Sequence, residues 1–239
     1  MEHPLSRSLI GKFDSAIVYP EAFPIERDDL IVSLGNGNGQ QMFAYKENCG
    51  RFIGVEILEE KNREALELAK QSEREYDFTA ITGDVTTIPL ASETCDKALA
   101  IDIIEHVPDE AFLKEIHRIL KTNGKLLITF PAMHDYYIWF GVWLKKNVAR
   151  KTTGGPYHWE DAYAHSCREW IEIVRRQGFV LRMSRATTLF PPLHTLGVPR
   201  FWFSNKVIHK LDSFLAGLPF VKYFGQTLMC VFEKQSTNT

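Results

Sequence analysis

The sequence predicts an α/β fold built on a mostly parallel sheet with helices on both faces. Short apolar runs alternate with charged, helix-forming stretches through the first half of the chain. A glycine-rich turn follows the first of these runs. The chain has 239 residues, of which 45% are hydrophobic and 24% charged, which suits one globular domain.

Five apolar runs have the length of buried strands, at 29–34, 51–57, 78–82, 97–103 and 125–130. Helix-forming stretches lie between them, at 40–48, 59–72 and 109–120. The third stretch places Phe112, Leu113 and Ile116 on one face, and the Asn123-Gly124 pair is expected to end it. This alternation predicts βαβ units.

The second half of the chain adds a helix at 168–177 and closing strands at 179–187 and 226–234. Two long connections, 132–165 and 188–225, carry eight aromatic residues each. We expect them to form an aromatic-rich cap over the sheet edge, with Trp139, Trp143 and Phe203 buried. The predicted single domain thus spans 1–239. It comprises an N-terminal segment (1–28), a binding core (29–131), two cap insertions (132–165 and 188–225) and closing elements (166–187 and 226–234).

Charge and cysteine content exclude several classes of protein. The formal net charge of −2 lacks the basic excess that binding along a phosphate backbone needs, so no nucleic-acid partner is expected. Four isolated cysteines form no CxxC pair and are expected as buried free thiols. No secretory signal and no apolar run of about 18–20 residues is present, so a cytoplasmic location is expected.

The most specific local signal is the run SLGNGNG at 33–39, where a strand turns towards a helix through three glycines. Glycine permits positive φ and lets a ligand lie against the backbone, while a helix N-terminus offers free amide donors. The dinucleotide fingerprint GxGxxG fails, because Gln40 and Met42 stand where its last glycine is required. This failure opposes a nicotinamide-dependent oxidoreductase.

Acidic residues lie at the end of the second predicted strand and just after the third. Glu56 comes 21 residues after Gly35, where a carboxylate can accept hydrogen bonds from both hydroxyls of a ribose. Asp84 follows the third strand and is placed to accept from an exocyclic amine. Ligands of open α/β sheets bind beyond the carboxyl ends of the strands, so these acids and the glycine turn predict one site.

Together these residues resemble the class I S-adenosylmethionine-dependent methyltransferases of type 11, a group similar to quinone-biosynthesis and small-molecule enzymes. The matching stretches are SLGNGNG, GVE, GDV, IDIIEHV and RILKTNGKL, at 33–39, 54–56, 83–85, 101–107 and 118–126. The resemblance implies a Rossmann-like sheet of seven strands with the last one antiparallel. It also implies S-adenosylmethionine as cofactor.

By the same resemblance, the glycine run holds the methionine portion, Glu56 the ribose, and Asp84 with Val85 the adenine. The implied cofactor-binding residues are Gly35, Asn36, Gly37, Asn38, Gly39, Glu56, Ile57, Gly83, Asp84, Val85, Asp102 and Ile103. One departure is Ser33, which stands where the family usually has an acid. Serine keeps a hydrogen bond but loses the charge, and this favours an alternative, a cofactor-binding partner or sensor protein without transfer activity.

Close to the expected methyl group, His106 is the candidate general base, because an imidazole can take a proton near neutral pH. Asp102, Glu105 and His106 also offer a less favoured metal site, and no metal is expected. The predicted reaction is methyl transfer to a small acceptor, apolar or lipid-linked, with oxygen favoured as the attacking atom. An oxidoreductase is the lesser alternative.

The two aromatic connections carry basic residues beside their aromatic runs, such as Lys145, Lys146 and Arg150 in the first. Such a composition suits the membrane interface, so a peripheral contact through 136–151 and 200–222, at the inner face of the membrane, is one interpretation. The other is the cap described above, packed over the cofactor. An apolar acceptor would reconcile the two.

Overall fold

The structure is a computed structural model of the chain. It describes residues 22–39, 45, 51–71, 77–131, 165–186, 211, 214–224 and 227–236. The predicted helix at 40–48 lies outside these ranges, apart from Tyr45. So do Trp139, Trp143 and Phe203, and most of the predicted cap.

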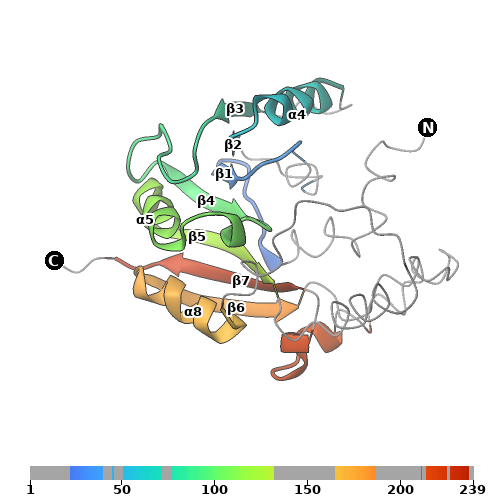
Figure 1. Cartoon of the computed structure of the whole chain (residues 1–239), viewed down its shortest axis with the longest axis vertical. Coiled ribbons are helices and arrows are strands. Elements are labelled where there is room, and N and C mark those ends of the chain that lie inside the picture. Colours follow the sequence, from blue (N-terminus) through green and yellow to red (C-terminus); the bar gives the residue numbers. More distant parts are fainter. Residues whose placement is uncertain are drawn as a thin grey trace, which may run out of the picture.

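A seven-stranded sheet forms the centre of the fold (Figure 1). Its strands are β1 Leu30–Leu34, β2 Arg51–Glu56, β3 Phe78–Thr82, β4 Cys95–Ala100, β5 Leu120–Pro131, β6 Phe179–Ala186 and β7 Thr227–Lys234. They lie in the order β3-β2-β1-β4-β5-β7-β6. β7 pairs antiparallel with both β5 and β6, and the pairings among β1 to β5 are parallel. The predicted sheet with its last strand antiparallel is therefore confirmed.

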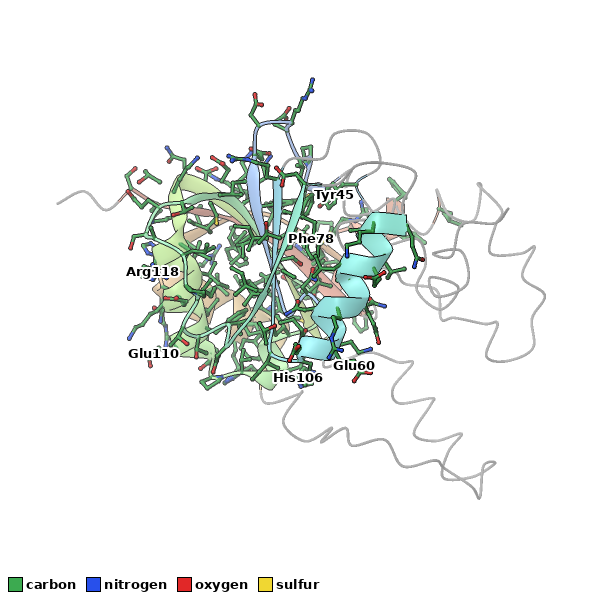
Figure 2. All side chains as sticks on the ribbon, turned by 90° about the horizontal axis from the view of Figure 1, so that it is seen from above. Tyr45, Glu60, Phe78, His106, Glu110 and Arg118 are labelled. Carbon is green, nitrogen blue, oxygen red and sulfur yellow. The ribbon has the colours of Figure 1, made fainter. Side chains whose placement is uncertain are left out.

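Helices cover both faces of this sheet. α5 (Asp109–Ile119) and α8 (Cys167–Arg176) contribute to one buried cluster, while α4 (Glu59–Gln71) packs Leu68 and Ala69 against the cluster on the opposite face. Figure 2 shows α4 and α5 on opposite sides of the strands. Neighbouring residues of a strand therefore point into different cores: Val32 faces the α5 side and Ile31 the other.

Three predicted boundaries were wrong. The strand predicted at 125–130 is β5, which already begins at Leu120. The helix predicted at 109–120, with Asn123-Gly124 as its stop signal, is α5, which ends at Ile119 because buried Leu120 is extended and pairs with Cys95. Asn123 does have a positive φ of 63°, but it lies in the irregular stretch where the β4–β5 register shifts. β4 ends at Ala100, so the predicted strand residues 101–103 belong to the loop that follows.

Cysteines within the described ranges are free and buried, as the sequence predicted: Cys95, Cys167 and Cys230. Burial raises the pKa of the Cys95 thiol to about 12, with a smaller contribution from the negative charge of Asp96. A thiol with so high a pKa holds its proton at neutral pH and is a poor nucleophile. No helix in the described part of the chain is long and apolar enough to cross a membrane.

A buried ion pair fixes the amino edge of the sheet. The Lys97 ammonium, on β4, donates to the Asp29 carboxylate and to the Pro24 carbonyl (2.8 Å). Both charged side chains are at most 14% exposed. The pair thus ties the segment before β1 to the middle of the sheet, at the end opposite the predicted site.

Substitution of Lys97 by alanine tests this tie. It leaves the Asp29 carboxylate buried without its cation, which should lower the free energy of unfolding by about 3–5 kcal/mol. Lys121→Ala is the matched control, because the Lys121–Asp96 pair is 47% and 29% exposed and should contribute under about 1 kcal/mol. Urea denaturation measures both, and equal losses would contradict the assignment.

Candidate functional site

The glycine run leaves β1 at the carboxyl edge and folds into a tight, hydrogen-bonded loop. Gly35, Gly37 and Gly39 all have positive φ, at 61°, 52° and 80°. The Asn36 amide donates to the Val55 carbonyl (3.1 Å), and the Gly39 amide donates to the Asn36 carbonyl (3.0 Å). The loop is therefore fixed against β2, the neighbouring strand.

Each glycine has a different reason to lack a side chain. A Cβ on Gly35 would lie 2.3 Å from the Ile103 side chain, and one on Gly39 would lie 3.2 Å from the Ala65 Cβ of α4. Among the described residues, no atom lies within 4 Å of such a Cβ on Gly37, so its backbone borders open space on their side. A ligand can lie against the loop at this point, which fits the cradle that a cofactor needs.

The Asn36 side chain does not face the site, although its position in the glycine run implies contact with the cofactor. Its side chain is 1% exposed, and a Cβ on Gly54 would lie 2.7 Å from the amide. The amide therefore packs behind the loop, where its nitrogen and oxygen have no partner among the described residues. A cofactor would meet the backbone of Asn36 rather than its side chain.

Glu56, at the end of β2, ties the glycine loop to the next loop. Its carboxylate accepts from the Gly37 amide on Oε2 (2.9 Å) and from the Leu58 amide on Oε1 (3.1 Å). A carboxylate has about four acceptor positions, so two remain for the hydroxyls of a ribose. The neighbouring Ile57 side chain is exposed and offers an apolar surface beside it.

Asn62, on α4, joins the carboxyl ends of β2 and β3. Its amide nitrogen donates to the carbonyls of Glu56 (3.2 Å) and Ile81 (3.1 Å) and to the Thr82 hydroxyl (3.0 Å). The Gly83 amide donates to the same Glu56 carbonyl (3.1 Å). The loops that carry Glu56 and Asp84 are thus held in one fixed arrangement.

Asp84 lies in an exposed turn after β3. Its Oδ1 accepts from the amide and the hydroxyl of Thr86, both at 2.8 Å, and these bonds lower the pKa of the carboxyl. Asp84 therefore stays ionised at neutral pH, as an acceptor for an amine must. Val85, the next residue, is buried in the core on the α5 side.

An ion pair on α5 holds the far end of this turn. Arg118 donates to the carbonyls of Leu90 (2.7 Å) and Ile88 (3.0 Å) and to the Glu115 carboxylate (2.7 Å), which accepts from the Ile88 amide (2.6 Å). The Arg118 bond keeps the pKa of Glu115 below its usual range. Together the two side chains fix the loop that begins at Asp84.

Asp102, after β4, has a left-handed backbone with φ of 52°, which a residue other than glycine rarely adopts. Thr129, a buried residue of β5, stabilises it: the Asp102 amide donates to the Thr129 hydroxyl (2.8 Å), which donates to Asp102 Oδ1 (3.2 Å). Strained backbone held by its surroundings is typical of functional sites. The adjacent Ile103 packs against Gly35 behind the glycine loop.

His106 ends a 3-10 turn, η2 (Ile104–His106), beyond β4. Its imidazole is 53% exposed and lies 3.9 Å from the Glu105 carboxylate, which is 12% exposed. Figure 2 shows His106 at the same end of the sheet as Glu60, at the start of α4. Within the described ranges, no three His, Cys, Asp or Glu side chains come together as metal ligands, and this includes Asp102, Glu105 and His106.

Comparison with known proteins agrees with this arrangement. A family model described as "Methyltransferase domain" matches residues 32–128. This span begins in β1 and ends in β5, and it contains every site residue described above except Thr129. Residues 32–128 are a class I, S-adenosylmethionine-dependent methyltransferase domain. This finding supports the family resemblance rather than the oxidoreductase alternative.

Relatives of the domain differ widely from it in sequence. An uncharacterized methyltransferase-like protein of Schizosaccharomyces pombe is 26% identical over 88% of this chain and 82% of its own length. The demethylmenaquinone methyltransferase of Chlamydia caviae is 31% identical over half of this chain and 53% of its own. A solved geranyl diphosphate C-methyltransferase of Streptomyces coelicolor, in complex with S-adenosyl-L-homocysteine, has the same fold. The two structures agree with a TM-score of 0.63 and 16% sequence identity, over 92% of this chain and 76% of the Streptomyces chain.

The positioning residues Asn62, Glu115 and Thr129 did not stand out in the sequence, whereas Arg118 begins the family-like stretch at 118–126. Asn62 interrupts a helix of strong helix formers, and Thr129 is the polar residue within the apolar run LLITF. Such polar residues at core positions are a usable signal, because burial requires a hydrogen-bond partner. Their partners are distant in sequence, so the signal does not say what they hold.

Substitution of Thr129 by valine tests the support of Asp102. Valine keeps the shape of threonine and its preference for strands but leaves the Asp102 amide without its acceptor, which should cost about 1–3 kcal/mol of unfolding free energy. Thr129→Ser is the matched control, because it retains the hydroxyl. Chemical denaturation measures both, and a valine variant as stable as the serine variant would contradict the assignment.

Proposed function

We propose that the methyltransferase domain transfers the methyl group of S-adenosylmethionine to a small apolar or lipid-linked acceptor, with an oxygen as the attacking atom. The observation that carries this proposal is the Glu56 carboxylate, which binds the glycine loop while keeping acceptor positions for a ribose. The remaining predicted site residues surround it at the ends of β1, β3 and β4.

The residues at this edge divide the cofactor between them. The backbone of the glycine loop at Gly37 would face the methionine portion, Glu56 the ribose hydroxyls, and Asp84 the amine of the adenine. Bound S-adenosylmethionine supplies a methyl group on a positively charged sulfur, which is already activated for transfer. The protein therefore has to place the acceptor in line with it and remove the acceptor's proton.

His106 is the group that we propose removes this proton. Its half-exposed imidazole can be reached by an acceptor, and an imidazole is a side chain that can take up a proton near neutral pH. An oxygen acceptor needs such a base more than a neutral amine does. This difference is why oxygen is favoured.

An apolar acceptor is supported by the relatives. One is named for demethylmenaquinone, and the Streptomyces enzyme is named for geranyl diphosphate, which carries a hydrocarbon chain. The chain spans about half of the Chlamydia enzyme, so that enzyme's acceptor is a guide to chemical class alone. An aromatic-rich composition in 132–165 and 188–225 suits an acceptor of this class.

The second candidate function is cofactor binding without transfer. It is favoured by Ser33, a buried residue of β1 at the position where the family usually has an acid. The two functions differ in one measurement: both predict binding of S-adenosylmethionine, but only the first predicts the appearance of S-adenosylhomocysteine when prenylated phenols are supplied.

Substitution of Glu56 tests the cofactor site. We expect S-adenosylmethionine to bind in the micromolar range and NAD not to bind, with Glu56→Ala weakening binding by about 1–3 kcal/mol. Glu56→Gln keeps one acceptor oxygen and should lose less. Glu59→Ala, which removes an exposed carboxylate three residues away, is the control and should bind as the parent does. Isothermal calorimetry that detects NAD alone would end the proposal.

Substitution of His106 tests the base. His106→Ala should lower the turnover number by about 10²–10⁴-fold, while the affinity for S-adenosylmethionine changes little. Methyl transfer from radiolabelled cofactor to prenylated phenols measures turnover, and calorimetry measures affinity. Equal losses in both would instead make His106 a residue that orders the loop after β4.

A further inference from the structure

Exposed apolar side chains are concentrated in one short segment, residues 214–224. Together with Leu211 just before it, the segment supplies four of the six exposed large hydrophobic residues in the described part of the chain: Leu211 (50%), Phe214 (67%), Phe220 (78%) and Phe224 (54%). The other two, Ile57 and Leu58, follow Glu56 directly, beside the proposed cofactor site. This concentration in one segment calls for a partner.

The segment has a defined conformation. Helical residues 214–216 lead into a turn at 217–220 and then into η5 (Val221–Phe224). The Gly217 amide donates to the Phe214 carbonyl (3.2 Å), and the Lys222 amide donates to the Leu218 carbonyl (3.1 Å). In Figure 1 this red segment lies beyond β6 and its turn projects away from the sheet.

The inner side of the segment is anchored to the protein. Ala216 is fully buried, and the Lys222 ammonium donates to the Ser184 hydroxyl on β6 (2.7 Å). Lys222 and Arg168 of α8 both lie over the Tyr223 ring, at 5.3 and 5.8 Å from its centre. Because these contacts fix the inner side, Phe214 and Phe220 are held outwards rather than free to fold back.

Cations flank the aromatic rings of the segment. Residues 214–224 contain Lys222 and no Asp or Glu, while Asp212 precedes them in the sequence. Exposed Arg168 of α8 lies over the Tyr223 ring of the segment. Exposed aromatic rings with flanking cations suit the interface of a bilayer that carries anionic lipids.

The size of the surface suits shallow insertion into a bilayer. Four side chains with these exposures present on the order of 500 Å² of apolar area. Shallow insertion of a few rings is how interfacial segments bind membranes. The basic charge beside the rings favours a bilayer that carries anionic lipids over a second copy of the chain.

We propose that residues 211 and 214–224 form a docking surface for an anionic lipid bilayer, with Phe214 and Phe220 as its inserting side chains. The segment joins the carboxyl end of β6 to β7, so it lies at the same edge of the sheet as the cofactor loops. Docking would bring to the membrane the edge of the sheet where the acceptor is proposed to bind. The sequence predicted contacts through 136–151 and 200–222, and 136–151 lie outside the described residues.

Docking itself does not depend on the proposed reaction. What rests on the proposed function is the purpose of docking, which is to supply an apolar acceptor from the bilayer. The test is co-flotation of the full chain with phosphatidylcholine vesicles that contain about a third phosphatidylglycerol. We expect binding that weakens at high salt, because charge contributes. Pure phosphatidylcholine vesicles should bind less.

Variants assign the binding to this surface. Phe220→Ser should weaken vesicle binding roughly tenfold, and Phe220→Trp should retain it. Arg168→Gln should weaken it roughly fivefold, while Arg176→Gln, at the other end of α8, should not. Calorimetry of S-adenosylmethionine binding should give the same affinity for all four, which separates a failure here from a failure of the proposed function.

Three outcomes would overturn the proposal. The parent chain could fail to float even at low salt. Phe220→Ser could abolish a concentration-dependent dimer seen by light scattering, which would assign the surface to a second copy. Phe220→Ser could also lower the melting temperature by several degrees without an effect on vesicles, which would show that the ring is covered within the protein.

Discussion

Parallel pairing of β1 with β2 and β4 is the constraint on which the site depends. In this arrangement the strand ends at Leu34, Glu56, Thr82 and Ala100 fall on one edge of the sheet. The loops that follow carry the glycines, the acids and His106. A strand reversed here would send its loop to the opposite edge, so the pairing fixes which loops can meet before any side chain contributes.

Hydrogen bonds to main-chain groups then turn neighbouring loops into one rigid unit. The Glu56 carbonyl accepts from Asn62 and Gly83, and the Glu56 carboxylate accepts from Gly37. A ligand that meets such an edge finds its partners already in place and loses less entropy on binding. The strained backbone at Asp102, supported by Thr129, belongs to the same rigid edge.

Charged groups are distributed differently at the two edges. Buried lysines stabilise the amino edge: Lys97 binds Asp29, and Lys234 donates to the Leu120 carbonyl (2.7 Å). The carboxyl edge instead presents the carboxylates Glu56, Asp84 and Asp102. Buried ammonium groups thus stabilise the amino edge, and the carboxyl edge keeps acceptors for a ligand. The proposed docking surface at 214–224 extends this edge towards a membrane.

Sequence alone determined the order and type of the strands, because apolar runs and glycine turns are local signals. It also predicted Glu56, Asp84 and the glycine loop as site residues, since each lies at or just beyond the end of a strand. Tertiary structure decided where α5 ends, because Leu120 joins the sheet through Cys95, and it placed the Asn36 amide behind the loop. It alone revealed Thr129 and Asn62 as supports, because their partners lie 27 and up to 20 residues away and meet them only when the strands pair.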